Sequence, residues 1–287
     1  MIFDTHVHYN LDPLASNWQS HWQKAQQHGV DKAVIVGSNF EDSNTALNIA
    51  SNDLNLFAAI GFHPDSYSDQ KVIDNWLIGG QLSLDEATSD IDTDIFELDL
   101  IANNKNVVAI GEIGLDYYWL DLPNLKQVEM IKQVQKLALV EQLKLAQKHQ
   151  LPVIIHCRDK QTPEELTAGN AYWDLLEIIR SLPTFSFVLH CVSGPLQYIK
   201  QMNNLGAYMG FDGNITYPKA EQIREIFTLC PQEKRLLETD APYLPPQSHR
   251  GKMCEPWMIS LTAQYLQTHF GQSLEQLNKN SMNFFRL

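Results

Sequence analysis

The sequence has few cysteines, few basic residues and no long apolar run. Its four cysteines contain no Cys-x-x-Cys pair and no signal-peptide pattern precedes them, so we expect no disulfide framework and a reducing, cytoplasmic location. No stretch approaches about 18 uninterrupted apolar residues, and we therefore expect no membrane-spanning helix. The 21 basic against 34 acidic residues give a net charge of −13, opposite to the basic surface of a protein that coats duplex nucleic acid. Any nucleic acid must therefore be bound locally.

Several common catalytic signatures are also missing. The sequence has no Gly-x-Ser-x-Gly, no His-Glu-x-x-His, no Gly-x-x-x-x-Gly-Lys-Ser/Thr, and no Gly-x-Gly-x-x-Gly after an apolar run. These absences argue against a serine-hydrolase elbow, a zincin helix, a P-loop and a dinucleotide fold.

What the sequence does contain is a regular alternation of short apolar runs and longer segments with helical periodicity. The runs predict eight strands: Ile2 to Asp4, Ala33 to Val36, Phe57 to Phe62, Val107 to Glu112, Pro152 to His156, Ser186 to His190, Ala207 to Phe211 and Arg235 to Thr239. Eight strands, each followed by a helix-sized segment, predict an α/β fold of the (β/α)8 TIM-barrel type, with one domain over 1–287. An open doubly wound sheet is the alternative that the same alternation permits.

Strongly polar residues stand at the ends of these strands or just beyond them. They are His6, His8, His63, Glu112, His156, His190 and Asp240. A barrel brings the carboxyl ends of many strands to one mouth, whereas an open sheet concentrates its ligand at one switch point, so this placement favours the barrel.

The composition of this set predicts a metal site. His6 and His8 are two residues apart, which in an extended chain puts both imidazoles on the same side. Together with Glu112, His156, His190 and Asp240 they supply four imidazoles and two carboxylates, more than one divalent ion normally takes from side chains. Two divalent ions bridged by a carboxylate account for the surplus. Cys157 and Cys191 follow strand histidines directly, so they should point the opposite way and pack among the helices.

The ordered motifs resemble the TatD-type metal-dependent deoxyribonucleases of the amidohydrolase-like barrels. The matching segments are Asp4-Thr-His-Val-His8, Gly61-Phe-His-Pro64, Gly111-Glu-Ile-Gly-Leu-Asp116, Pro152-Val-Ile-Ile-His-Cys-Arg158, His190-Cys-Val-Ser-Gly194, Glu238-Thr-Asp-Ala-Pro-Tyr-Leu-Pro245, His249-Arg-Gly-Lys252 with Glu255-Pro256, and Asn280 to Phe285. The resemblance implies a hydrolase that cleaves DNA phosphodiesters with two divalent ions. We expect it to cleave from strand ends. Magnesium is expected in function, and zinc or manganese can occupy such sites.

The resemblance also implies roles for individual residues. It places His6, His8 and Asp240 on one ion and His156 with His190 on the other, with Glu112 between the two ions. By motif position, Arg158, Arg250 and Lys252 are the basic residues nearest the mouth and are the candidates for phosphate contacts.

Other roles follow from chemistry and strand parity. Asp240 is the carboxylate available to take a proton from water. His63 is either a group that contacts the phosphate or protonates the leaving group, or a structural histidine. Glu238 shares the parity of Asp240 and is a candidate partner for a ligand imidazole. The aromatic run 117–119 after the fourth strand offers faces for unpaired bases, or packs against a loop.

Two departures from the family pattern stand out. The segment from about 66 to 104, after the third strand, is longer and more acidic than expected and is interpreted as an insert. Cys254 stands where the family pattern has asparagine. The rival functions are hydrolysis of a cyclic amide or ester by the same barrel, and hydrolysis of the ester in D-aminoacyl-tRNA. We expect DNA or another ester as the binding partner, and neither a membrane nor an obligate protein partner.

Overall fold

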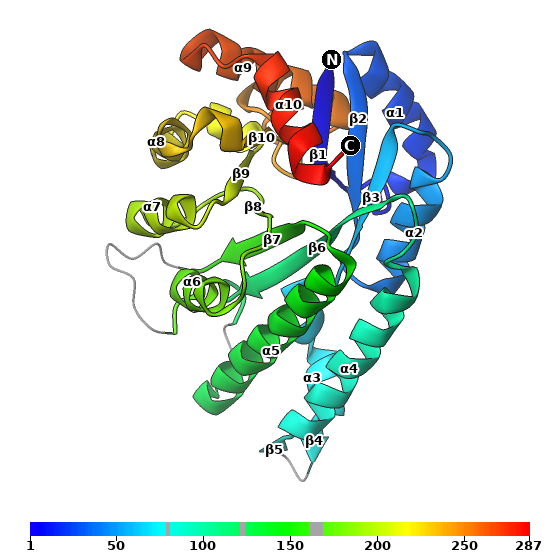
Figure 1. Cartoon of the computed structure of the whole chain (residues 1–287), viewed down its shortest axis with the longest axis vertical. Helices are drawn as coiled ribbons and strands as arrows, with labels where there is room; N and C mark the ends of the chain where they lie inside the picture. The colour runs from blue at the N-terminus through cyan, green and yellow to red at the C-terminus, as the bar shows by residue number, and fades with distance from the viewer. Residues whose placement is uncertain (79–80, 121–123, 161–168) are drawn as a thin grey trace.

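The eight predicted strands all form, and they make one parallel sheet that curves into a barrel (Figure 1). The computed structural model describes residues 1–287 except 79–80, 121–123 and 161–168. The sheet contains β1 (Ile2–Val7), β2 (Val30–Val36), β3 (Leu56–Ile60), β6 (Val107–Asp116), β7 (Val153–Arg158), β8 (Phe187–Leu189), β9 (Tyr208–Phe211) and β10 (Arg235–Leu237), in that spatial order. Sequential neighbours therefore pair, as the βα alternation requires.

The first strand and the last meet at their carboxyl ends. The amide of His8 donates to the carbonyl of Ala241 at 2.9 Å, and the amide of Asp240 donates to the carbonyl of His6 at 2.9 Å. Val7 pairs with Ala241 in a parallel bridge. These contacts bring the two ends of the strand order together, which confirms the barrel over the open sheet.

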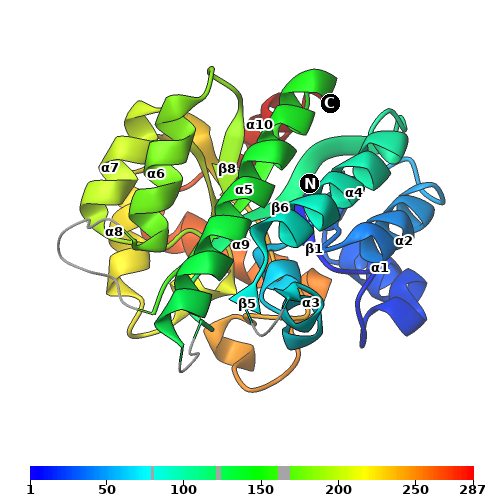
Figure 2. The ribbon, with the colours of Figure 1, turned by 90° about the horizontal axis from the view of Figure 1, so that it is seen from below.

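Helices surround the barrel on its outer side (Figure 2). They are α1 (Trp18–Gln27), α2 (Phe40–Ala50), α4 (Leu84–Ile101), α5 (Leu125–His149), α6 (Ala171–Ser181), α7 (Leu196–Asn204), α8 (Glu221–Leu229) and α9 (Ile259–Phe270). Several begin where the sequence supplies a capping side chain: the side chain of Asn39 accepts the amide of Asp42 at 2.9 Å ahead of α2, and Ser83 accepts the amide of Glu86 at 3.3 Å ahead of α4.

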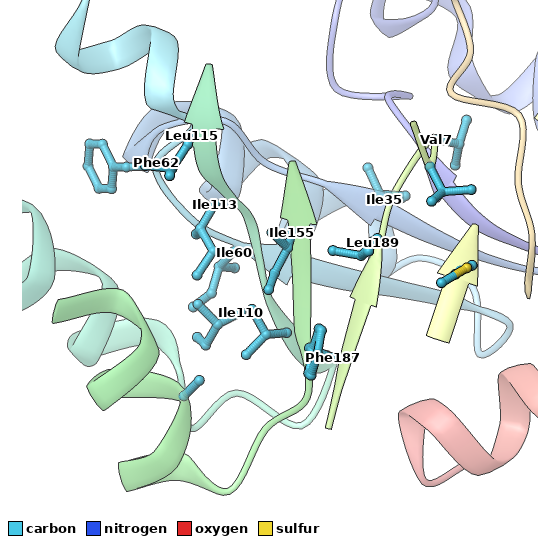
Figure 3. Packing of buried hydrophobic residues seen from close by; sticks show 14 of the residues in the cluster. Val7, Ile35, Ile60, Phe62, Ile110, Ile113, Leu115, Ile155, Phe187 and Leu189 are labelled. Carbon is cyan, nitrogen blue, oxygen red and sulfur yellow. The ribbon is translucent and has the colours of Figure 1, made fainter. Parts of the chain in front are cut away.

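The strand side chains divide between two apolar clusters, as alternation in a parallel barrel predicts. The larger cluster lies between strands and helices and includes Ile35, Ile60, Ile155 and Leu189 (Figure 3). The smaller cluster takes neighbouring positions on the same strands, such as Val34, Ile154, Val188 and Leu236, and these point into the barrel. The two faces of each strand are thus both buried.

The last helix, α10 (Leu274–Phe285), closes the amino end of the barrel. Its Phe285 ring lies 5.7 Å from the ring of Phe3 on β1, and its Phe284 ring lies 4.9 Å from Tyr208 at the start of β9. Asn280 donates to the carbonyl of Arg235 at 2.8 Å. These aromatic side chains fill the amino end of the barrel. Polar side chains can therefore gather at the opposite, carboxyl end.

The segment interpreted as an acidic insert, about 66–104, divides into two parts. Helix α4 carries the acidic run but packs along α5, in the place between β3 and β6 that an outer-ring helix occupies (Figure 1). Among the described residues of this segment, α3 (Gln70–Asn75) and the antiparallel hairpin of β4 (Leu77–Ile78) and β5 (Gln81–Leu82) stand outside the alternation. The sequence analysis did not predict this hairpin, because each of its strands has only two residues.

Two of the acidic residues on α4 anchor the chain that leaves β3. The indole Nε1 of the buried Trp76 donates to Asp90 at 2.8 Å, and the hydroxyl of the buried Tyr67 donates to Asp94 at 2.8 Å. Asp90 and Asp94 are one helical turn apart, so both face the same side of α4. Part of the acidity therefore pairs with aromatic donors.

Candidate metal centre

Polar side chains gather in one cleft at the carboxyl ends of the strands. The cleft has a volume of ≈ 680 Å³. Its lining residues are His8, Leu11, Ser38, Asn39, His63, Asp65, Ser66, Asp69, Glu112, His156, Arg158, His190, Asp240, Tyr243 and Leu244. They are spread along the sequence between residues 8 and 244, and closure of the barrel brings them together.

Strand parity explains why the candidate ligands point inward. His156 follows Ile154 by two residues, and His190 follows Val188 by two, and both Ile154 and Val188 belong to the apolar cluster inside the barrel. Alternate residues of a strand share a face, so each histidine stands one layer above an aliphatic side chain. The polar set is the top layer of the barrel interior.

His6 lies at the centre of one group of side chains. Its Nε2 atom is 3.2 Å from Nε2 of His8, 3.3 Å from Oε2 of Glu112 and 3.8 Å from Oδ1 of Asp240. The His6 ring also stacks on His190 with 3.6 Å between centroids. His6 is fully buried and Glu112 exposes only 5% of its surface, so these groups interact with little screening by water.

Glu112 connects this group to the other side of the cleft. Its Oε1 atom lies 2.8 Å from Nδ1 of His156, 3.6 Å from Nε2 of His190 and 3.6 Å from Nε2 of His63. Its two oxygens therefore face different histidines, which is the arrangement that a bridging carboxylate requires.

All six predicted ligands are brought together, and their close contacts fall into three overlapping groups. Each group has ligand atoms within 4.8 Å of one another: His6, His8 and Asp240; His6, Glu112 and His190; His63, Glu112 and His156. The first group coincides with one predicted ion site. The other two share Glu112 but separate His190 from His156, and they add His63.

The orientation of His8 fits a bound cation. Its Nδ1 atom lies 3.0 Å from the carbonyl oxygen of Val36, which can only accept, so Nδ1 carries the proton. In a neutral ring, Nε2 then presents a lone pair to Oδ1 of Asp240, 3.5 Å away. A lone pair facing a carboxylate is repulsive unless a proton or a cation lies between them. The donor set of imidazoles and carboxylates is the one that zinc, manganese and related divalent ions bind.

When no cation is bound, protons on the histidines offset the negative charge of the carboxylates. Burial alone would lower the pKa of His190, but the negative charges of Glu238 and the cluster carboxylates raise it to about 10. Burial would likewise lower the pKa of His156, yet hydrogen bonds to Asp116 and Glu112 raise it to about 9. Burial would raise the pKa of Glu112, but the surrounding imidazoles, His190 foremost, hold it well below its usual value. A metal would displace the histidine protons.

Glu238 holds the far side of the His190 ring. Its Oε1 atom lies 3.0 Å from Nδ1 of His190 and accepts the amide of Cys191 at 2.6 Å. This is the contact that strand parity predicted, and carboxylates in this position fix the orientation of ligand histidines. A Cβ on Gly210 would stand 2.2 Å from Oε2 of Glu238, so only glycine leaves room for the carboxylate.

Asp116 has a similar position beside His156, and the sequence analysis assigned it no role. Its Oδ2 atom lies 3.0 Å from Nε2 of His156 and accepts Nε of Arg158 at 2.8 Å. The signal was available, since Asp116 ends β6 four residues after Glu112 and therefore has the same parity. Asp116 therefore contacts both a candidate ligand and the guanidinium that lines the cleft.

His63 faces the cleft with a defined tautomer. The amide of Asp65 donates to Nδ1 of His63 at 3.2 Å, so the neutral ring carries its proton on Nε2, which points toward Glu112. Burial and the charge of His156 lower the pKa of His63 to about 3. The ring is therefore neutral near pH 7 and offers a hydrogen-bond donor to the cleft.

Other predicted residues lie elsewhere. Arg158 lines the cleft. Arg250 and Lys252 are exposed on the loop that follows β10 and are not among the lining residues. The carbon of the Arg250 guanidinium lies 4.6 Å from the centroid of the Tyr217 ring. The candidate metal-ligand groups among the described residues include no cysteine. Tyr117 does not offer a face for stacking, because it is buried.

The fold is a TIM barrel whose strand carboxyl ends gather imidazoles and carboxylates in candidate metal-binding groups, as in metal-dependent TIM-barrel hydrolases. The sequence model of the TatD related DNase family matches residues 3–287, and the chain belongs to this family.

Relatives include the uncharacterized metal-dependent hydrolase YjjV of Escherichia coli K12, 33% identical over 255 residues (89% of this chain, 85% of the relative). The 3'-5' ssDNA/RNA exonuclease TatD of Shigella flexneri serotype 5b is 31% identical over 248 residues, which cover 86% of this chain and 81% of the relative. The crystal structure of Escherichia coli YjjV, a TatD homolog, superposes with a TM-score of 0.76 at 28% identity and covers 100% of this chain and 98% of that one. Within the described residues, the helices include none that is long and apolar enough to cross a membrane.

Proposed function

We propose that the protein is a divalent-metal-dependent phosphodiesterase that cleaves DNA, preferentially from strand ends. The observation that carries the proposal is that Glu112 turns one oxygen toward His6 and the other toward His156. A single carboxylate that faces two sets of imidazoles suits two adjacent ions. The family, and the exonuclease name of one relative, support the choice of nucleic acid as substrate.

We assign the ligand positions to His6, His8, Glu112, His156, His190 and Asp240. Two ions held there would neutralise a phosphodiester and lower the pKa of bound water. Their charge also offsets the acidity of a chain with a net charge of −13. Magnesium in function suits the carboxylates of this cleft, and manganese or zinc suit its imidazoles.

The remaining groups divide the proton chemistry. In the metal-free site the positive charge of His190 and a hydrogen bond from His8 outweigh the effect of burial and lower the pKa of Asp240, so Asp240 is an ionised carboxylate. Bound cations would take the place of those positive charges. Asp240 is therefore available to accept a proton from the attacking water. The Nε2–H of the neutral His63 is placed to donate a hydrogen bond to a phosphate or leaving-group oxygen. Arg158 supplies a guanidinium at the edge of the cleft.

The test is metal-dependent hydrolysis of end-labelled DNA strands, with aminoacylated tRNAs as competing substrates. Chelation should abolish cleavage, and Mg²⁺ or Mn²⁺ should restore it. Glu112→Gln should reduce kcat by at least about 100-fold, since a bridging ligand acts in the transition state. Glu97→Gln, which changes a carboxylate on α4 outside the cleft, is the matched control.

Two results would overturn the proposal. Wild-type turnover in Glu112→Gln would exclude the bridging role. Hydrolysis of the aminoacyl ester with no cleavage of any DNA strand would identify the rival function, an esterase built on the same site.

A further inference from the structure

Two exposed aromatic rings stand beside the cleft, directly after β6. Tyr118 exposes 38% of its surface and Trp119 exposes 63%. The two rings meet nearly edge to face, with centroids 4.7 Å apart and an interplanar angle of 82°. Isolated exposed aromatic side chains are common on protein surfaces, but this pair lies against Arg158, which lines the cleft of the candidate metal centre.

The backbone that leads into the rings is anchored to the carboxyl ends of β6 and β7. The amide of Tyr118 donates to Oδ1 of Asp116 at 2.9 Å, and the amide of Tyr117 donates to the carbonyl of Arg158 at 2.9 Å. The Tyr117 ring is buried, and its hydroxyl donates to Asp174 at 3.0 Å. The backbone at the start of this aromatic run is thus fixed before any ligand arrives, which reduces the entropy lost on binding.

Arg158 connects the rings to the candidate metal centre. Its guanidinium carbon lies 5.1 Å from the centroid of Tyr118 and 5.6 Å from that of Trp119, within the range of cation–π attraction. The same guanidinium donates to Oδ2 of Asp116, the atom that contacts His156. One carboxylate therefore sets the position of a candidate metal ligand and of the ring pair's cationic neighbour.

The charge distribution of the cleft shows where a polyanion can approach. Asp65, Asp69 and Asp240 are among the lining residues, and Arg158 is the single lysine or arginine in that lining as far as the structure describes it. Arg158 is thus the lysine or arginine of the lining that a phosphate near the candidate metal centre could contact. The centroids of the Tyr118 and Trp119 rings lie 5.1 and 5.6 Å from the carbon of that guanidinium.

We propose that Tyr118 and Trp119 form a stacking platform for an unpaired nucleobase next to the scissile phosphodiester. This inference rests on the proposed function. Bases stack on aromatic side chains and arginine planes whatever their identity, and each stacked base contributes about 1–3 kcal/mol. A base paired in a duplex has its faces covered by its neighbours and cannot reach the platform. The platform therefore selects single-stranded ends without selecting sequence.

The experiment is a cycle that combines Trp119→Ala with removal of the base from the substrate. Short single strands are prepared intact, or with one abasic site at each of the three nucleotides next to the cleaved end. KM and kcat are measured for each strand. A strand with 2-aminopurine at the same positions reports stacking directly, because its fluorescence is quenched when the base stacks.

Trp119→Ala should raise KM for the intact strand by about 5- to 150-fold, the equivalent of about 1–3 kcal/mol, with little change in kcat. It should not change KM for the strand that lacks the stacked base. Trp119→Phe should retain most of the affinity. The matched control is Phe96→Ala, since Phe96 is also 63% exposed but lies on α4 outside the cleft lining.

The two hypotheses fail in different ways. If the wild-type protein cleaves no strand, the proposed function fails, and the platform fails with it. Suppose instead that the wild type cleaves, that Trp119→Ala has the wild-type KM on intact and abasic strands, and that it quenches 2-aminopurine fluorescence as much as the wild type does. The platform alone is then overturned.

Discussion

Glu238 offers the sharpest test of how the protein prepares its histidines for a metal. The carboxylate exposes only 1% of its surface, and its Oε1 atom serves both the His190 ring and the amide of Cys191. Glu238→Gln keeps an oxygen at that position but removes the charge that favours a well-oriented, basic imidazole. Glu238→Ala removes both the charge and the contact.

The expected magnitude follows from these contacts. Loss of a carboxylate partner of a ligand histidine costs about 10- to 100-fold in metal affinity, or about 1.4–2.7 kcal/mol. We expect Glu238→Gln near the lower value and Glu238→Ala near the upper one. Gly210→Ala should also lower the affinity for the metal, because the added Cβ would lie 2.2 Å from Oε2 of Glu238 and push that carboxylate away.

The assay is direct titration with Mn²⁺, followed by calorimetry or by the electron paramagnetic resonance signal of the free ion. Glu233→Gln, an exposed carboxylate just ahead of β10, is the control and should bind as the wild type does. A folded Glu238→Ala variant with wild-type affinity for Mn²⁺ would refute the reasoning. A melting temperature measured without metal shows whether each variant is folded.

Two further predictions concern stability. Burial raises the pKa of Asp94 from 3.8 to about 7, so the folded protein keeps a proton that the unfolded chain releases, and the free energy of unfolding should fall as the pH rises from about 4 to 7. Asp94→Asn should flatten this fall in urea titrations and the exposed Asp92→Asn should not; equal slopes in both variants would contradict the assignment. Ile155→Ala removes a fully buried side chain and should lower the free energy of unfolding by about 2–5 kcal/mol, whereas Leu54→Ala, at a side chain 91% exposed, should change it by less than about 0.5 kcal/mol. A similar loss in both variants would show that burial does not set the cost.

The fold was predictable because its signals are local. Each barrel strand is a short aliphatic run, and each is followed by a segment with helical period, so the order and number of the barrel strands could be read along the chain. The hairpin of β4 and β5 was missed because two residues show no period. The acidic run of α4 was interpreted as part of an insert, since charge alone does not reveal that a helix packs along α5.

The site was predictable to the extent that parity decides direction. His6 and His8 share a face because they are two residues apart, and Glu238 shares that of Asp240 for the same reason. Parity does not give distances between strands. It could not show that His63 stands as near Glu112 as His190 does, nor that Arg250 lies outside the lining of the cleft.

The sequence by itself therefore determined which strands exist and which side chains face the barrel interior, because both depend on the spacing of residues along an extended chain. Only the tertiary structure decided which of those side chains meet. Closure of the sheet sets Glu112 between imidazoles from different strands, puts Asp116 against both His156 and Arg158, and leaves two aromatic rings exposed beside them. Such contacts depend on the stagger and curvature of neighbouring strands, which no local pattern encodes.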